Sequence, residues 1–417
     1  MRLPYGAVVS IDGARLLDRL AELAQIGAIE GTQGCSRLAF SDADREGRDL
    51  VVTWMRDLGL TVTVDTVGNV VASTGGDGAT GAVMTGSHID TVGTGGRYDG
   101  NLGVLAGLEV IEATLAAGIE LQRPLAVAFF SNEEGSRYPP DMMGSLAYVG
   151  GMSVESVLKV EGADGTIVGE ELERIGYRGS APCPGAIPHA YVELHIEQGP
   201  VLDRAGLQIG VVEGVQGISW TELVLTGQSN HAGTTPMALR RDPMAVAAEV
   251  AVAARDIALE LGGSQVATVG SLTLHPNLVN VVPANATMTI DLRNTDEKTL
   301  QLAENQLRIR TAELAEVEGV DVTSRALARF EPVEFDGRVV NQIEQLATKS
   351  GLSMRRMPSG AGHDAQMLSR ICPTAMIFVP SVDGVSHNPA EHTEEQDLIA
   401  GAQLLADTLL ALTEVTW

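Results

Sequence analysis

The stretch GSHIDTVGTGGRYDGNLG, residues 86–103, decides how the fold is interpreted. The apolar run at 82–85 before it predicts a buried strand, and the Ala- and Leu-rich segment from Val104 onward predicts a helix. The glycines between them allow sharp turns and a close approach of the backbone. A strand followed by a loop with His88 and Asp99, and then by a helix, is where open α/β sheets place their functional residues. This stretch alone fits an ordinary glycine-rich loop equally well, so the rest of the chain has to decide.

Other segments repeat this pattern of buried strands and amphipathic helices. Apolar runs predict further strands at 124–130, 191–196 and 374–380, each buried on both faces. Apolar spacing predicts helices at 11–26, from Ser41 onward, at 339–350 and at 394–412. The sequence therefore predicts an α/β fold in which helices flank a mixed sheet.

The pattern changes between residues 212 and 331. Strands are expected at 218–226, 265–274, 286–293 and 321–330, and helices at 243–261 and 298–318. The order strand-helix-strand-strand-helix-strand is typical of a ferredoxin-like α+β unit. We therefore expect this unit as an inserted domain at 212–331, between a first part of the main domain at 1–211 and a second part at 332–417.

Composition argues against several classes of protein. The formal net charge of −26 disfavours binding to nucleic acid and to anionic membrane surfaces. No apolar run reaches the ~18 residues that span a bilayer. The cysteines, Cys35, Cys183 and Cys372, form no CxxC pair, so neither a disulfide framework nor a thiolate zinc site is expected. The first residues lack the layout of a signal peptide, and we expect a cytoplasmic protein.

Histidines and acids gather at the predicted strand ends: His88, His195, His387, Asp99, Glu133 and Glu134. Because the carboxyl ends of parallel strands meet at one edge of a sheet, these side chains are expected to converge. Nitrogen and oxygen ligands without a thiolate suit Zn, Mn, Co or Ni. An acid that bridges would hold two such ions.

The adjacent acids Glu133 and Glu134 are expected to have different roles. Adjacent residues at a strand end point in different directions, so one can bind metal while the other faces a metal-held water as a general base. Two acids at a helix N-terminus are the alternative interpretation. Asp90, two residues after His88, is expected to accept the second imidazole N–H of that histidine.

A series of motifs from Gly86 to Glu391 carries a family resemblance. In chain order they are GSHIDTVGTGGRYDGNLGVLAG, FSNEEGSRY, HIEQGPVLD, GQSNHAGTTPM, NVVPAN, DLRN, SGAGHDAQ and SHNPAE. The ordered set resembles the N-carbamoyl-L-amino-acid hydrolase, allantoate amidohydrolase and β-ureidopropionase group of the aminoacylase/carboxypeptidase-type dimetal hydrolases. One departure is Asn132, where many relatives carry another acid.

The resemblance implies a role for each residue of the cluster. His88 and His195 would hold one divalent metal ion, and Glu134 and His387 would hold the other. Asp99 would bridge both ions. Glu133 would then be the general base.

The resemblance also implies a substrate site. Arg293 and Asn280 of the inserted domain would hold a substrate carboxylate. Gln198 and His231 would contact the carbamoyl or amide end, with His231 reaching the site of a partner subunit and stabilising the oxyanion. The pocket would be lined by Gly362 and His363.

The function implied by the resemblance is hydrolysis of linear amides other than peptides. The expected reaction converts an N-carbamoyl-L-amino acid and water into an L-amino acid, CO2 and ammonia. The substrate would be a small molecule with a carboxylate and a ureido group, and the inserted domain would serve as a lid and as the contact of a homodimer. Allantoate amidohydrolase and β-ureidopropionase remain alternatives, as do an aminoacylase or dipeptidase and a non-catalytic metal-binding dimer.

Overall fold

The computed structural model describes residues 9–76 and 80–416. The chain divides into two compact units. Unit 1 comprises the residues up to Glu213 and those from Phe335 onward, and unit 2 comprises Gly214–Glu334. The boundaries expected from the sequence, after residues 211 and 331, lie close to these positions.

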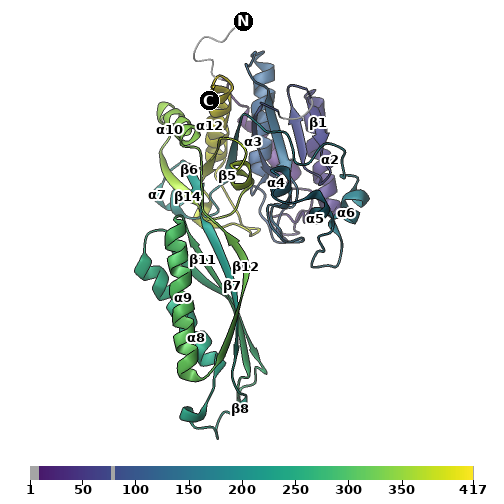
Figure 1. Ribbon diagram of the computed structural model, residues 1–417. Helices are drawn as coiled ribbons and strands as arrows, with labels where there is room; N and C mark the ends of the chain where they lie inside the picture. Colours follow the sequence, from purple (N-terminus) through teal and green to yellow (C-terminus); the bar gives the residue numbers. More distant parts are fainter. Residues whose placement is uncertain (1–8, 77–79, 417) are drawn as a thin grey trace. The chain divides into compact units, whose positions relative to one another are not determined.

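Unit 1 is built on a mixed sheet with helices packed against it (Figure 1). The strand order is β1-β2-β4-β3-β5-β15-β6-β13, and β14 also pairs with β6. The strands β4, β3, β5 and β15 run parallel, and β1, β2 and β6 are antiparallel to their neighbours. The parallel strands are fully buried, and β4 and β15 are apolar on both faces. The strands are β1 (Thr61–Val64), β2 (Val70–Ser73), β3 (Val83–His88), β4 (Leu125–Phe130), β5 (Ala190–Ile196), β6 (Ile209–Val215), β13 (Val333–Glu334), β14 (Met354–Ser359) and β15 (Thr374–Val379).

Helices pack against this sheet. The most deeply buried is α3 (Asn101–Ala116), which contacts β3, β4 and β5 and also α1 (Gly13–Leu23) and α12 (Glu395–Thr413). The helix predicted from Ser41 onward is α2 (Asp42–Asp57), and the Ser41 side chain caps it by accepting the Asp44 N–H. The other helices of unit 1 are α4 (Met143–Tyr148), α5 (Val154–Leu158), α6 (Val168–Ile175), α7 (Val201–Ala205), α10 (Gly337–Lys349) and α11 (Asp364–Leu368), with a 3-10 turn η2 (Val382–Gly384).

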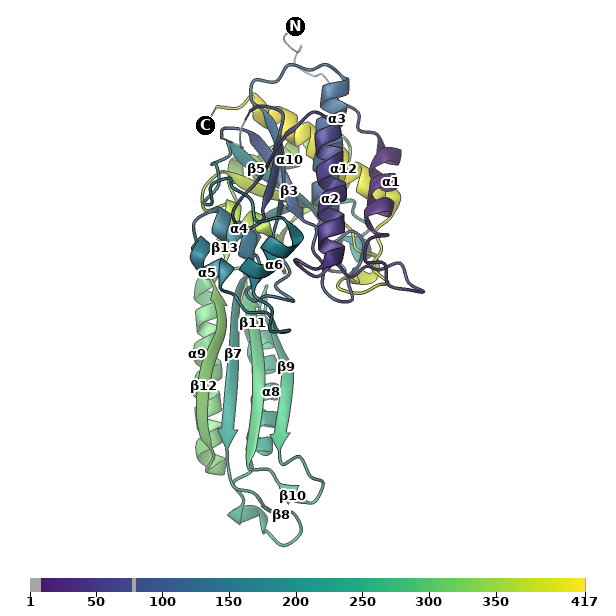
Figure 2. The same ribbon diagram turned by 90° about the vertical axis from the view of Figure 1, so that its right-hand side faces the viewer.

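Unit 2 confirms the predicted ferredoxin-like fold. Its four antiparallel strands have the order β12-β7-β11-β9, and the helices α8 and α9 pack on one face of this sheet. Their shared core includes Leu225, Val250, Ala286 and Leu300. A short ribbon of β8 and β10 lies at one end of the sheet (Figure 2). The elements are β7 (Gly217–Thr226), β8 (Asn230–His231), η1 (Met237–Leu239), α8 (Pro243–Leu261), β9 (Val266–His275), β10 (Val281–Val282), β11 (Asn285–Asn294), α9 (Glu297–Glu318) and β12 (Asp321–Phe330).

Within the described part of the chain, every helix falls short of the length and apolarity that crossing a membrane requires.

Candidate metal centre

The parallel strands of unit 1 bring the predicted cluster together at one edge of the sheet. His88 is the last residue of β3, and His195 lies one residue before the end of β5. Glu133 and Glu134 follow β4, and His387 lies in the loop after β15. Asp99 lies in the loop between β3 and α3. These elements are neighbours in the sheet, which is why side chains far apart in the sequence meet.

The loop that carries Asp99 requires a glycine at position 100. Gly100 has a φ of +66°, and a Cβ at this position would lie 2.4 Å from a ring atom of His88. A larger residue would therefore strain the backbone and displace the imidazole. The glycine lets Asp99 fold back against β3.

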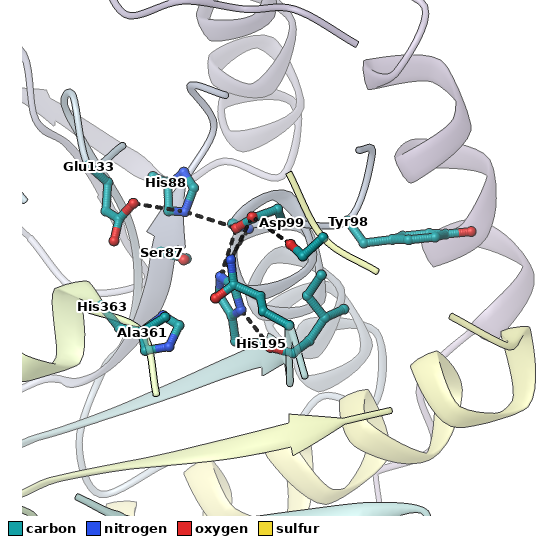
Figure 3. Close-up of polar contacts among 12 residues, drawn as sticks. Ser87, His88, Tyr98, Asp99, Glu133, His195, Ala361 and His363 are labelled. Atoms are coloured by element: carbon teal, nitrogen blue, oxygen red, sulfur yellow. Dashed lines mark hydrogen bonds and ion pairs between the residues drawn. The ribbon is translucent and has the colours of Figure 1, made fainter. Parts of the chain in front are cut away.

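Asp99 presents its two oxygens to different partners. Its Oδ1 lies 3.5 Å from His88 Nε2 and 3.2 Å from His195 Nε2 (Figure 3). Its Oδ2 lies 3.3 Å from His387 Nε2, and that nitrogen lies 3.3 Å from Glu134 Oε2. Two triads of possible ligands, His88-Asp99-His195 and Asp99-Glu134-His387, therefore share one carboxylate.

The hydrogen bonds of the buried histidines fit a metal. The Nδ1 atoms of His88 and His195 each lie 2.9 Å from a backbone carbonyl oxygen, of Asp90 and Ile196 respectively. A carbonyl only accepts, so each Nδ1 carries the proton and each Nε2 presents a lone pair toward Asp99. Tetrahedral bonds of about 2.0–2.1 Å place ligand atoms about 3.3–3.4 Å apart. The separations from Asp99 Oδ1 match this spacing.

The electrostatics of the cluster favour positive charge at its centre. Burial lowers the pKa of His195, but the carboxylates of Asp99 and Glu193 together outweigh burial and leave the pKa raised. The hydrogen bond to Asp99 raises the pKa of His387 to about 9. Burial opposes ionisation of Asp99, yet the three imidazoles hold its pKa well below the usual range. Either protons on these side chains or a bound cation would supply this positive charge.

The two adjacent glutamates occupy different places. Glu134 belongs to the second triad, and burial raises the pKa of its carboxyl to about 8. Glu133 is outside both triads, and its Oε2 lies 3.4 Å from His88 Nε2 (Figure 3). Burial raises the pKa of Glu133 well above its ordinary value. Because Glu133 lies beside the possible ligands but outside both triads, its carboxylate can accept and donate a proton.

The expected contact of Asp90 is wrong. The backbone carbonyl of Asp90, not its carboxylate, accepts the His88 Nδ1–H. The carboxylate accepts the backbone N–H groups of Glu133 and Glu134, each at 3.3 Å. The physical reason is that β3 ends at His88, so residue 90 no longer follows the alternation of the strand. Asp90 therefore links the β3 end to the loop after β4.

The predicted pocket residues of unit 1 lie at the cluster. Gln198 Nε2 donates to Asp99 Oδ2 at 2.8 Å and lies 3.4 Å from His387 Nε2. The ring of His363 meets the ring of His195 at 4.5 Å in a T-shaped contact, and Gly362 precedes it. Burial holds the pKa of His363 well below its ordinary value, which favours the neutral imidazole.

The predicted substrate residues of unit 2 are not brought together. His231 and Asn280 are exposed near the β8–β10 ribbon. This ribbon follows the end of the sheet where β11 begins, since Gly227 N–H donates to Ala284 O just before β11. Arg293 is near the other end of β11, where it pairs with Asp291 at 2.9 Å. The eight residue steps from Asn285 to Arg293 span about 26 Å of extended strand. One small ligand cannot contact both ends within a single copy of unit 2.

Two buried acids that support the cluster, Glu391 and Glu193, were not predicted from the sequence. Glu391 accepts the backbone N–H groups of Tyr98 and Asp99 at 3.0 and 3.3 Å, and the Ser386 hydroxyl at 3.1 Å. Glu193 accepts from the Ser87 hydroxyl at 2.7 Å and from the backbone N–H of Ala365 at 2.8 Å. An acid inside an otherwise apolar strand was the available signal for Glu193.

Fold and cluster together define a class. The mixed sheet carries nitrogen and oxygen donors at the ends of its parallel strands, and the ferredoxin-like unit is inserted between two parts of this main domain. The chain is therefore a two-domain protein with a candidate dinuclear metal centre.

Comparison with known proteins identifies the family within this class. The model of Peptidase family M20/M25/M40 matches residues 84–411. An N-carbamoyl-L-amino acid amidohydrolase of Geobacillus stearothermophilus is 38% identical over 97% of this chain and 99% of its own length. The allantoate amidohydrolase of Escherichia coli (strain K12) is 36% identical over 96% of this chain and 97% of its own. The crystal structure of a hydantoinase/carbamoylase family amidase from Burkholderia multivorans has a TM-score of 0.93 and 42% identity, covering 98% and 100% of the two chains.

The chain belongs to the M20 family and, within it, to the hydantoinase/carbamoylase group of amidohydrolases, which act on linear amides. The resemblance inferred from the motifs is confirmed at this level.

Proposed function

We propose that this enzyme hydrolyses the ureido group of an N-carbamoyl-L-amino acid, with water, to an L-amino acid, CO2 and ammonia. The observation that carries the proposal is the position of Asp99, whose two oxygens face two separate triads of possible ligands. The similarity to a protein named N-carbamoyl-L-amino acid amidohydrolase supports the choice of substrate. A small substrate with a ureido group and a carboxylate is therefore our first candidate.

In this proposal two divalent ions, Zn, Mn, Co or Ni, are the cofactor. His88, His195 and Asp99 would hold one ion, and Glu134, His387 and Asp99 would hold the other. The donor set of imidazole nitrogens and carboxylate oxygens suits these metals. When bound, the ions would lower the pKa of a coordinated water toward ~7 and polarise the ureido carbonyl.

Glu133 is the proposed general base. It lies beside the first triad without belonging to it, and its carboxylate is shielded from solvent. From this place it can take a proton from the attacking water and pass it to the leaving nitrogen. Gln198 would donate to the carbamoyl end, and Gly362 and His363 would line the pocket.

The residues of unit 2 suggest a dimeric site. Arg293 offers a planar fork for both oxygens of a carboxylate. His231 and Asn280 lie near the β8–β10 ribbon, at the opposite end of β11 from Arg293, too far away to share a small ligand with it. We therefore propose that unit 2 is a lid and a dimer contact, and that His231 and Asn280 of one subunit serve the site of the other. His231 would stabilise the oxyanion of the transition state.

A substrate panel tests the proposal. Metal-reconstituted enzyme is incubated with N-carbamoyl-L-amino acids, ureidopropionate, allantoate, N-acyl-L-amino acids and dipeptides, and ammonia and free amino groups are measured. The highest kcat/KM is expected for an N-carbamoyl-L-amino acid. Preference for acyl-amino acids or dipeptides would overturn the proposal.

Allantoate is the second candidate, because the named allantoate amidohydrolase is almost as similar to this chain as the carbamoyl relative. A higher kcat/KM on allantoate in the same panel would select it. The proposed roles of the ligands and of Glu133 would be unchanged by that result.

A further inference from the structure

Two arginines of unit 1, Arg37 and Arg48, have fully buried side chains, and they are paired differently. Arg48 forms a salt bridge with Asp44 at 2.9 Å. Arg37, by contrast, donates only to uncharged oxygens within the described ranges of the chain. A buried cation without a carboxylate partner is costly to a fold. Its hydrogen bonds therefore point to a role that a neutral side chain could not fill.

Two acceptors of the Arg37 guanidinium lie close in the chain to His88 and Asp99. Its Nε donates to the carbonyl of Ile89 at 3.1 Å, directly after His88. Its Nη2 donates to Asn101 Oδ1 at 2.7 Å, two residues after Asp99. One rigid guanidinium thus spans the two ends of a glycine-rich loop.

The same guanidinium anchors this loop to the end of α1. Its Nη1 donates to the carbonyls of Leu23 and Ile26, at 3.0 and 2.9 Å. The backbone adds a second link, since Arg37 N–H donates to Thr91 Oγ1 at 2.8 Å and Thr91 N–H donates to Arg37 O at 2.9 Å. Several directed bonds from a planar group restrict the loop much more than a point charge could.

We propose that Arg37 is a positioning residue that holds His88 and Asp99 at ligand spacing and thereby sets the affinity of the His88-Asp99-His195 triad for a divalent metal. The inference rests on the metal centre proposed above. The charge of Arg37 by itself opposes a second cation nearby. The benefit must therefore come from the geometry of the fork.

Zinc binding to the metal-free protein tests this inference without any substrate. Zn²⁺ affinity is measured by competition with a chromophoric chelator for the wild type and for Arg37→Met. We expect the variant to bind Zn²⁺ about 10- to 100-fold more weakly, the usual effect of losing support around metal ligands. Arg37→Lys keeps the charge without the fork and should lose nearly as much. Wild-type affinity in a folded Arg37→Met or Arg37→Lys protein would overturn the proposal.

Arg15→Met is the matched control. Arg15 also links α1 to α3, through a 2.7 Å bond to the buried Glu109, but it does not touch the loop of the triad. This variant should lose thermal stability and retain the wild-type Zn²⁺ affinity. An equal loss of affinity in Arg15→Met would show a general effect of destabilisation and would refute the role of Arg37.

A second variant covers the case in which Arg37→Met does not fold. Asn101→Ala removes one acceptor of Arg37, and we expect Zn²⁺ binding about 3- to 10-fold weaker. Unchanged affinity in folded Asn101→Ala would contradict the proposal. A wild type that binds no zinc would instead refute the metal centre itself, so the two failures are distinguishable.

Discussion

The cluster of unit 1 and the ribbon end of unit 2 hold their functional side chains in opposite ways. His88, His195 and Asp99 are almost fully buried, and each has a further contact that fixes its orientation. His231 is exposed in the short ribbon of β8 and β10, and Asn280 is exposed directly before β10. The difference indicates that the cluster is built within one chain in advance of any ligand. The residues of unit 2 need a ligand and, in our proposal, a second subunit.

The largest expected effect is on chemistry at the cluster. Glu133→Gln keeps the shape of the side chain and removes its ability to accept a proton, so kcat should fall about 10²- to 10⁴-fold. Both metal ions should remain, because Glu133 is outside the triads. Elemental analysis and steady-state kinetics measure the two quantities, with Glu170→Gln on the surface of α6 as a control. Full activity of Glu133→Gln would remove it as the base.

The next effect distinguishes the two triads. His387→Ala removes one of the three donors of the second triad and leaves His88 and His195 in place. Purified protein should then contain about one metal ion per subunit where the wild type contains about two. An unchanged metal content would show that His387 is not a ligand.

Subunit mixing sharpens the comparison between the units. In the proposed homodimeric state, the Glu133→Gln and His231→Ala proteins should each be nearly inactive. After exchange in an equimolar mixture, about a quarter of wild-type activity should return, because half of the dimers are hybrids with one intact site. Hybrid formation is verified by mass spectrometry of tagged subunits. No recovery despite exchange would place His231 in its own subunit's site.

The smallest expected effect concerns the carboxylate. Arg293→Lys retains the charge but loses the planar fork, so KM should rise about 10-fold with kcat nearly unchanged. The carboxamide analogue of the same N-carbamoyl amino acid serves as the control substrate, and its KM should be the same for both enzymes. An equal rise for acid and amide would mean that Arg293 does not recognise the carboxylate.

Much of the fold could be predicted because apolar periodicity reports it directly. The uninterrupted apolar runs of β4 and β15 identify buried parallel strands, and the strand and helix order of unit 2 specifies a ferredoxin-like fold. The edge strand β14 (Met354–Ser359) was not predicted. Arg355 and Arg356 make it polar, so it carries no apolar signal.

The departure at Asn132 also has a structural explanation. Its Nδ2 donates to the carbonyls of Tyr138 and Pro140, at 2.7 and 3.2 Å. An ionised acid has no hydrogen to donate to either carbonyl. The amide therefore stabilises the turn after β4 in a way that a carboxylate could not.

By itself, the sequence determined which side chains could converge, because residue type and strand position follow from local pattern. His88, His195 and the glutamates after β4 were identifiable in this way. Only the tertiary structure decided how they are oriented. The carbonyl of Asp90, the carboxylate of Glu391 and the guanidinium of Arg37 reach their partners through the path of loops. Each of these contacts joins a side chain to a backbone group. Because backbone N–H and C=O groups are the same in nearly every residue, the sequence does not reveal which of them will be the partner.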